Sequence, residues 1–135
     1  MAQIDTSPLD QLLRYLWDTG ATDLHLAAGT TPRVRIDGRL AVIPNAVPIT
    51  TEFLDAVLTG LLDEDDQERY LAERQLDFAF TWTEKARFRA NAFFQLDRPA
   101  LALRLIPTNI PTPESIGLPE SLTGLLNRPH GLVLM

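Results

Sequence analysis

The sequence predicts an α+β fold, in which helices pack on one face of a mostly antiparallel sheet. Two observations support this class. Segments with apolar residues at helical spacing are interspersed with segments that alternate apolar and polar residues, in the order α-β-β-β-α-α-β-β-β. A proline-rich segment then follows the last strand and indicates a linker, because proline cannot continue a sheet. With 135 residues, 45% of them hydrophobic, the chain is long enough to bury a core.

The first helix is predicted to begin at Ser7, since serine is a favoured N-cap and Pro8 suits the first turn. Asp10 adds a negative charge near the positive end of this helix. Gly20 is expected to end the helix in the left-handed conformation. The apolar stripe that should face the core consists of Leu9, Leu12, Leu13, Leu16 and Trp17.

The next segment, residues 21–28, alternates like a half-buried strand. Leu24 and Leu26 fall on one face, and Asp23 and His25 fall on the other. An aspartate near a histidine suggests a catalytic dyad, but no nucleophilic serine is visible near this pair in the sequence. A structural, hydrogen-bonded histidine is therefore the favoured interpretation, and a hydrolase site is the alternative.

A hairpin is predicted where Asp37 and Gly38 separate two short alternating runs, residues 33–36 and 39–43. Asp-Gly is a strong short-range signal for a two-residue turn, because both positions of that turn need a positive φ. Asp37 and Gly38 are therefore expected to form a structural motif of the sheet.

Two further helices are expected in the middle of the chain. Thr50 or Thr51 should cap the first, and four acidic residues, 63–66, precede the second, which is expected near Tyr70–Arg74. The acidic run resembles a calcium loop, but the glycine and the closing glutamate of an EF-hand are missing. The four acids are predicted instead to lie in solvent at a helix N-terminus, where negative charge is favourable.

The last three strands are predicted over residues 76–82, 86–96 and 100–106. The middle strand alternates clearly, and the final strand is apolar on both faces except at one arginine, which is typical of a buried central strand. Residues 97–99 are predicted to form the loop between them.

An arginine cluster is predicted on this final hairpin. Arg87 and Arg89 project from one face of their strand, and the predicted loop places Arg104 opposite Asn91 and diagonal to Arg89. Two or three guanidinium groups then share one sheet face, in a chain of net charge −6. Either neighbouring Asp and Glu side chains balance them, or they grip a phosphate or a transition-state charge.

The chain is predicted to have three parts: a domain over residues 1–106, a linker over residues 107–130 and an apolar strand over residues 131–135. Five prolines interrupt the linker, in which one short helix is expected over residues 120–127. The terminal strand has nothing in this chain to complete its sheet. It is therefore expected to be the first strand of a second domain.

Charge and composition argue against several functions. The chain has 18 acidic and 12 basic residues and a pI of about 4.8, which does not suit a nucleic-acid binder that relies on a broad basic surface. It has no cysteine for disulfides or thiolate metal sites. No signal peptide is visible, and no apolar run approaches the ~20 residues of a membrane span. A cytoplasmic protein is expected.

Several motifs, taken together, carry a resemblance to a known family. They are residues 21–40 (ATDLHLAAGTTPRVRIDGRL), 76–80 (LDFAF), 86–95 (ARFRANAFFQ), 104–107 (RLIP) and 129–135 (PHGLVLM). Their order and spacing resemble the N-terminal domain of the type IV pilus retraction (twitching motility) ATPases, the PilT family of the secretion ATPase superfamily, in which a strand similar to the last segment leads into the Walker A loop. The chain departs from that family in small ways, such as ATDLHL where ASDLHL is commoner, and bulkier side chains at Phe94 and Leu96.

The resemblance implies a PAS-like domain in a homohexameric motor. In such motors this domain closes over ATP and Mg²⁺ bound by RecA-like domains of the same and neighbouring subunits, and its arginines reach the phosphates. By position Arg87, Arg89 and Arg104 match those arginines. The resemblance also implies a cytoplasmic protein, peripheral to the inner membrane, that meets the platform protein of the pilus and binds no nucleic acid.

The 135 residues contain no GxxxxGK[ST] phosphate loop. Phosphoryl transfer needs a positioned water and magnesium that such a loop holds, so this chain by itself is expected neither to bind a cofactor nor to be an enzyme. The alternative to a motor domain is a free-standing PAS-like sensor or interaction module, which predicts an apolar pocket with a few polar groups.

Overall fold

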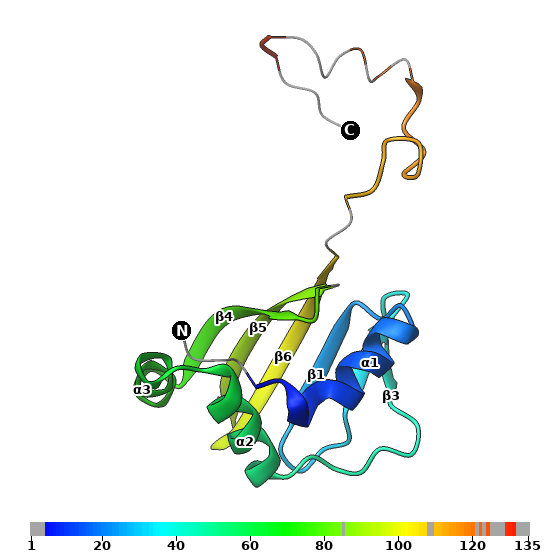
Figure 1. The fold of residues 1–135 in the computed structure, drawn as a ribbon. Coiled ribbons are helices and arrows are strands. Elements are labelled where there is room, and N and C mark those ends of the chain that lie inside the picture. Colours follow the sequence, from blue (N-terminus) through cyan, green and yellow to red (C-terminus); the bar gives the residue numbers. More distant parts are fainter. Residues whose placement is uncertain are drawn as a thin grey trace.

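The computed structural model describes residues 5–84, 86–107, 110–120, 122, 124 and 129–131. Six antiparallel strands form one sheet in the order β3-β2-β1-β6-β5-β4, and α1 and α2 lie on one face of it (Figure 1). The predicted α+β class and order of elements are thus confirmed. The elements are η1 (Ser7–Leu9), α1 (Asp10–Asp18), β1 (Asp23–Ala27), β2 (Arg33–Ile36), β3 (Arg39–Val42), α2 (Thr51–Leu61), α3 (Glu64–Glu73), β4 (Gln75–Trp82), β5 (Ala86–Gln95) and β6 (Arg98–Pro107).

The start of the first helix differs from the prediction at Ser7. A single 3₁₀ turn, η1, precedes α1, and Ser7 lies inside that turn rather than capping it. The carboxylate of Asp5 accepts hydrogen bonds from the Ser7 backbone, at 2.9 Å, and from the Ser7 hydroxyl. Ser7 therefore donates to the earlier acid, and a backbone bond closes the first turn, in which the Leu9 N–H donates to the Thr6 carbonyl oxygen at 2.9 Å. Gly20 ends the helix with φ +66°, as predicted.

The two helices in the middle of the chain are capped as local chemistry requires. The hydroxyl of Thr50 accepts from the Phe53 backbone N–H at 3.1 Å and starts α2. The carboxylate of Asp63 accepts from the Asp66 backbone N–H at 2.8 Å and starts α3. The acidic run therefore lies at a helix N-terminus, as predicted, and the helix begins earlier than the expected Tyr70–Arg74 segment.

The hairpin between β2 and β3 has the predicted turn. Asp37 and Gly38 have φ values of 48° and 78°, the left-handed pair that a two-residue hairpin needs. The side chain of Arg35 closes over this turn, donating from Nη1 to the carbonyl oxygen of Gly38 at 3.0 Å.

The register predicted for the last hairpin was wrong. The turn between β5 and β6 is Leu96-Asp97, with φ values of 50° and 58°, and not residues 97–99. Because this turn is shorter and lies earlier in the chain than the predicted loop, the pairing shifts by two residues: Arg104 lies directly opposite Arg89, and Asn91 lies opposite Ala102. The turn was missed because leucine is rarely found in the left-handed region.

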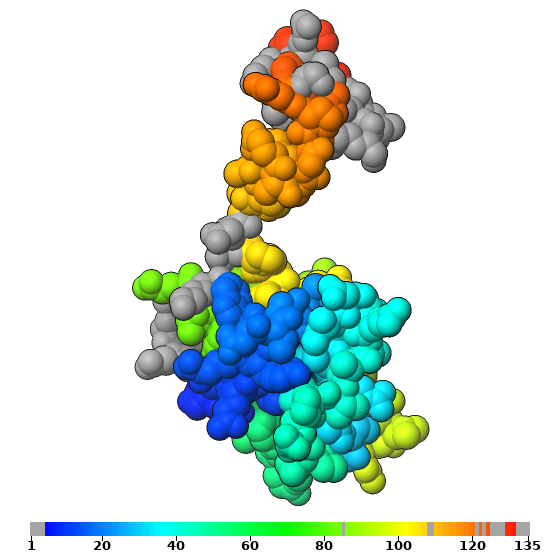
Figure 2. All heavy atoms as spheres, turned by 90° about the vertical axis from the view of Figure 1, so that its right-hand side faces the viewer, coloured from blue at the N-terminus to red at the C-terminus, as the bar shows by residue number. Residues whose placement is uncertain are grey.

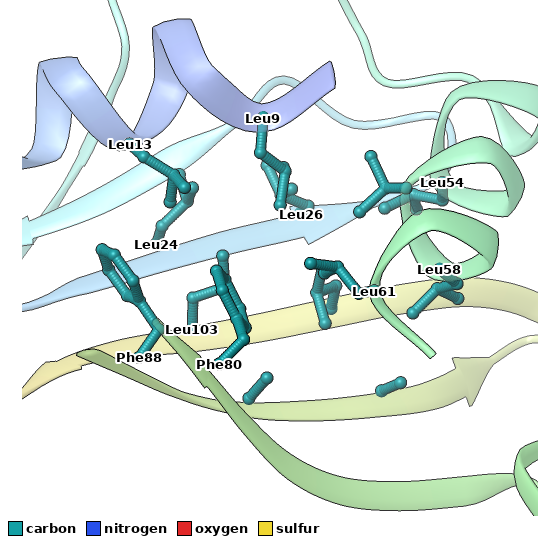
Figure 3. Close-up of a cluster of buried hydrophobic side chains, with 14 of the residues drawn as sticks. Leu9, Leu13, Leu24, Leu26, Leu54, Leu58, Leu61, Phe80, Phe88 and Leu103 are labelled. Atoms are coloured by element: carbon teal, nitrogen blue, oxygen red, sulfur yellow. The ribbon is translucent and has the colours of Figure 1, made fainter. Parts of the chain in front are cut away.

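The core fills the space between the helices and the sheet (Figure 3). The buried side chains of this layer come from both helices and from the middle strands, and many are fully buried. Phe88 stacks on Phe80 at 5.5 Å between ring centroids and meets the edge of Trp82 at 6.2 Å. The side chains that Figure 3 labels are Leu9, Leu13, Leu24, Leu26, Leu54, Leu58, Leu61, Phe80, Phe88 and Leu103.

After β6 the described residues add no strand to the sheet. Residues 110–120 form a turn-rich segment that stands away from the body of the domain (Figure 2). The helix predicted over residues 120–127 and the strand predicted over residues 131–135 fall largely outside the described residues. They stay predictions, as does the three-part division of the chain.

Candidate functional site

A row of charged side chains crosses the sheet on the face opposite the helices, called here the outer face. Strand pairing places Asp23 of β1 between Arg35 of β2 and Arg104 of β6, and it places Arg104 directly opposite Arg89 of β5. Side chains alternate along a strand, and most of the chain neighbours of these four residues are buried under the helices. The four residues, called the arginine row below, therefore share the outer face.

Asp23 is the one buried charged residue in the part of the chain that the structure describes, at 7% exposure. Its carboxylate accepts from Arg104 Nε at 2.9 Å and from the Thr22 hydroxyl at 2.7 Å, and it lies 3.4 Å from Arg35 Nε. Burial by itself raises the pKa of Asp23, but the hydrogen bonds from Thr22 and Arg104 outweigh it, so the pKa lies below its usual value. The carboxylate is ionised at neutral pH.

The three predicted arginines differ in their surroundings. Arg104 pairs with Asp23, although its side chain is 71% exposed. Neither Arg87 nor Arg89 forms an ion pair with any residue that the structure describes. Arg87 lies further along β5, opposite Ile106. An internal acid therefore balances one arginine of the predicted cluster and leaves two for another partner.

His25 lies beside the arginine row, opposite Ala102. Its Nε2 atom is buried and has no hydrogen-bond partner among the described residues. Burial lowers the pKa of His25; Asp23 opposes this effect, while Arg35 and Arg104 reinforce it. The histidine is thus neutral at pH 7. A hydrogen-bonded histidine was predicted, but its Nε2 atom forms no hydrogen bond with a described residue.

A shallow depression of about 270 Å³ opens on the outer face over these residues. The described residues that line it include no serine, threonine or cysteine, so the hydrolase alternative finds no nucleophile here. The described residues contain no group of three metal-ligating side chains either. The lining residues are Asp23, His25, Asp77, Arg89, Ala90, Asn91, Ala102, Leu103 and Arg104.

This arrangement favours an anion. Arg89 and Arg104 are directly opposite each other on neighbouring strands, and like charges in that position repel. An anion between two guanidinium groups removes the repulsion and accepts charge-assisted hydrogen bonds from both. Phosphate suits this geometry, because the planar guanidinium group can donate two parallel hydrogen bonds.

The sensor alternative needs an apolar pocket that a small ligand could enter. The layer between helices and sheet is instead filled by leucine and phenylalanine side chains. One mainly apolar hollow is an open groove between α1 and the segment 43–53, with Leu12, Tyr15 and Val47 in its lining. The filled layer therefore argues against the sensor alternative and favours a domain that acts through contacts on its surface.

One member of the row, Arg35, was not identified from the sequence. It lies in the strand predicted over residues 33–36, but only the pairing of β1 with β2 brings it to Asp23. The signal that could have found it is the Asp-Gly turn, which fixes the register of β2 against β3 and so the face of Arg35.

The sheet and the helices on its inner face form the fold found at the N-terminus of secretion ATPases. The crystal structure of the pilus retraction motor PilT with bound ADP superposes on 87% of this chain with a TM-score of 0.75 and 31% identity, and the match covers 34% of that chain. The ATPase DotB of Legionella pneumophila shares the fold, with a TM-score of 0.67 over 89% of this chain and 34% of its own, at 22% identity. No family model matches the chain.

Sequence comparison gives the more particular relationship. The type IV pilus ATPase PilU of Pseudomonas aeruginosa is 32% identical over 125 residues, which are 93% of this chain and 32% of PilU. The retraction ATPase PilT of the same organism is 32% identical over 127 residues, which are 94% of this chain and 37% of PilT. The chain therefore spans about a third of the length of these relatives. It is homologous to the N-terminal domain of the type IV pilus ATPases.

Proposed function

We propose that this chain is the N-terminal domain of a homohexameric pilus retraction ATPase, and that its outer face contributes arginine contacts to ATP. The observation that carries the proposal is the opposed pair Arg89 and Arg104, exposed on a sheet face that no helix among the described residues covers. The relative PilT, a retraction ATPase, and the ADP in the PilT crystal structure support a nucleotide as the anion.

The proposed chemistry is charge stabilisation during phosphoryl transfer. Negative charge is spread over the oxygens of the transferring group, and a guanidinium group placed against them lowers the barrier. Arg87 and Arg89 are the stronger candidates for this contact, since neither has an acidic partner among the described residues. Arg104 is held by Asp23 and has a partly structural role.

The remaining parts of the reaction belong to a RecA-like ATPase domain of the same and neighbouring subunits. ATP and Mg²⁺ would be held there, and this domain would close over them and help subunits to pack in the ring. The proposed location is the cytoplasmic side of the inner membrane, beside the platform protein of the pilus. In the described part of the chain, no helix is both long and apolar enough to cross a bilayer.

The test is steady-state ATP turnover in the full-length motor with Arg87→Lys, Arg89→Lys and Arg104→Lys. Lysine keeps the charge and loses the planar fork. Loss of a phosphate contact is expected to lower kcat by about 10³-fold in Arg87→Lys or Arg89→Lys without changing the fold. Arg69→Lys is the matched control, because Arg69 pairs with Asp66 on α3 and is not on the outer face.

Wild-type turnover in all three outer-face variants would refute the phosphate contact. Lower stability with unchanged turnover per folded hexamer would show that the arginines only balance charges within the sheet.

A further inference from the structure

We propose that Asp23 is a positioning residue for a two-arginine anion site formed by Arg104 and Arg89. Its carboxylate anchors Arg35 at the β2–β3 turn and holds Arg104 by Nε alone. The inference rests on the proposed function for the class of its ligand, a polyphosphate. The proposal adds an acidic residue to an anion site. Simple electrostatics predicts that removing an acid tightens anion binding, whereas the proposal predicts that removing the Asp23 carboxylate weakens it.

The two guanidinium groups on Asp23 are held in different ways. Arg35 is fixed at two points, since Nε lies 3.4 Å from Asp23 and Nη1 donates to the Gly38 carbonyl at 3.0 Å. Arg104 is fixed at one point, since Nε donates to Asp23 Oδ1 at 2.9 Å. The Arg104 side chain is 71% exposed, and its terminal nitrogens donate to no other described residue, so they can donate to a ligand.

The carboxylate is itself held firmly. Asp23 Oδ2 accepts from the Thr22 hydroxyl at 2.7 Å, and the residue is 7% exposed. A buried carboxylate with partners on both oxygens leaves little freedom to the side chain that it binds. Arg104 is a long side chain with several rotatable bonds. Because the contact with Asp23 already restrains it, binding a ligand costs less conformational entropy.

A second acid in the same depression provides the comparison. Asp77 lines the depression from β4, is exposed, and accepts from Asn91 Nδ2 at 3.2 Å. It forms no ion pair with Arg89 or Arg104 within the described part of the chain. Asp77 therefore has the same charge as Asp23 near the same ligand and lacks the contact with Arg104.

The test is the binding of inorganic triphosphate to the 135-residue chain at low ionic strength, followed by NMR. Asp77→Asn removes a negative charge and is expected to tighten binding about twofold. Asp23→Asn removes the same charge and is expected to weaken binding at least about threefold, because one neutral amide oxygen replaces two charged acceptor oxygens and holds Arg104 less firmly. In the wild-type chain, the Arg104 Nε–H signal should exchange slowly, and it should lose this protection in Asp23→Asn.

Tighter or unchanged binding in Asp23→Asn would overturn the proposal, and so would a wild-type chain that does not bind triphosphate at millimolar concentrations. If Asp23→Asn fails to fold, the exposed Thr22 takes its place. Thr22→Val removes the hydroxyl that fixes Asp23, and Thr22→Ser retains it. Weaker binding in the valine variant than in the serine variant supports positioning, and equal binding overturns it.

The two proposals can fail separately. Wild-type turnover in the lysine variants, together with weaker triphosphate binding in Asp23→Asn, would remove the motor contact and leave the anion site. Slow turnover in the lysine variants, together with equal effects of Asp23→Asn and Asp77→Asn, would leave the motor contact and remove the positioning role.

Discussion

The two faces of the sheet differ in what holds their side chains. The inner face is covered by α1 and α2 and is packed with fully buried apolar groups. The outer face carries the arginine row, with Asp23 as its one buried charged residue among those described. Residues 88 and 89 are neighbours on β5, yet Phe88 is 0% exposed and Arg89 is exposed. Because one face supplies the stability, the other can hold like charges side by side.

The largest expected effect compares these two neighbours. Phe88→Ala should lower the free energy of unfolding by about 3–5 kcal/mol, because it empties a fully buried site between Phe80 and Trp82. Arg89→Ala should change it by less than about 0.5 kcal/mol, and the change should be stabilising where repulsion from Arg104 is relieved. Urea denaturation of the two variants measures both values. Similar losses in the two variants would show that the outer face also holds the fold together.

A smaller effect tests the turn that decides which residues meet on each face. Leu96 is 90% exposed and has φ 50°, a strained conformation for leucine. Leu96→Asn should stabilise the chain by about 0.5–1 kcal/mol, since asparagine favours that conformation at the first position of such a turn. The same substitution at Leu40, an exposed leucine in strand β3, should destabilise slightly, because asparagine is a poor strand residue.

Thermal or urea unfolding of both asparagine variants is the measurement. A loss of stability in Leu96→Asn would contradict the two-residue turn, and with it the pairing of Arg89 with Arg104.

The smallest expected effect concerns His25 on the outer face. Burial keeps the pKa of His25 below the usual 6.5, so the unfolded chain binds a proton before the folded chain does. The free energy of unfolding should therefore fall as the pH is lowered from 7 through 6.5 towards the folded pKa, and level off below it. His25→Gln should abolish this part of the pH dependence. Asp23 does not contribute there, because its pKa lies below 3.8.

Urea denaturation at several pH values between 7 and 5 measures the change. An identical pH dependence in wild type and His25→Gln would mean that His25 is solvated in the folded protein.

Much of the fold could be predicted from local pattern. The order of elements followed from periodicity, because a helix and a strand repeat their apolar residues at different intervals. The β2–β3 hairpin followed from Asp37-Gly38, whose residues suit the turn that they form. The same alternation placed Asp23 with His25 on one face of their strand, and Arg87 with Arg89 on one face of theirs. The sequence motifs also sufficed to identify the family.

What only the tertiary structure decided was which residues meet across the strands. β1 and β6 are neighbours in the sheet although the paired residues Asp23 and Arg104 are far apart in the chain. No local pattern encodes such a pairing. The register of β5 against β6 depends on Leu96-Asp97, a turn that the preferences of its residues do not favour and that the pairing of two ten-residue strands imposes. The sequence thus determined the faces, and the packed sheet determined the partners, because side-chain alternation is local whereas strand pairing is not.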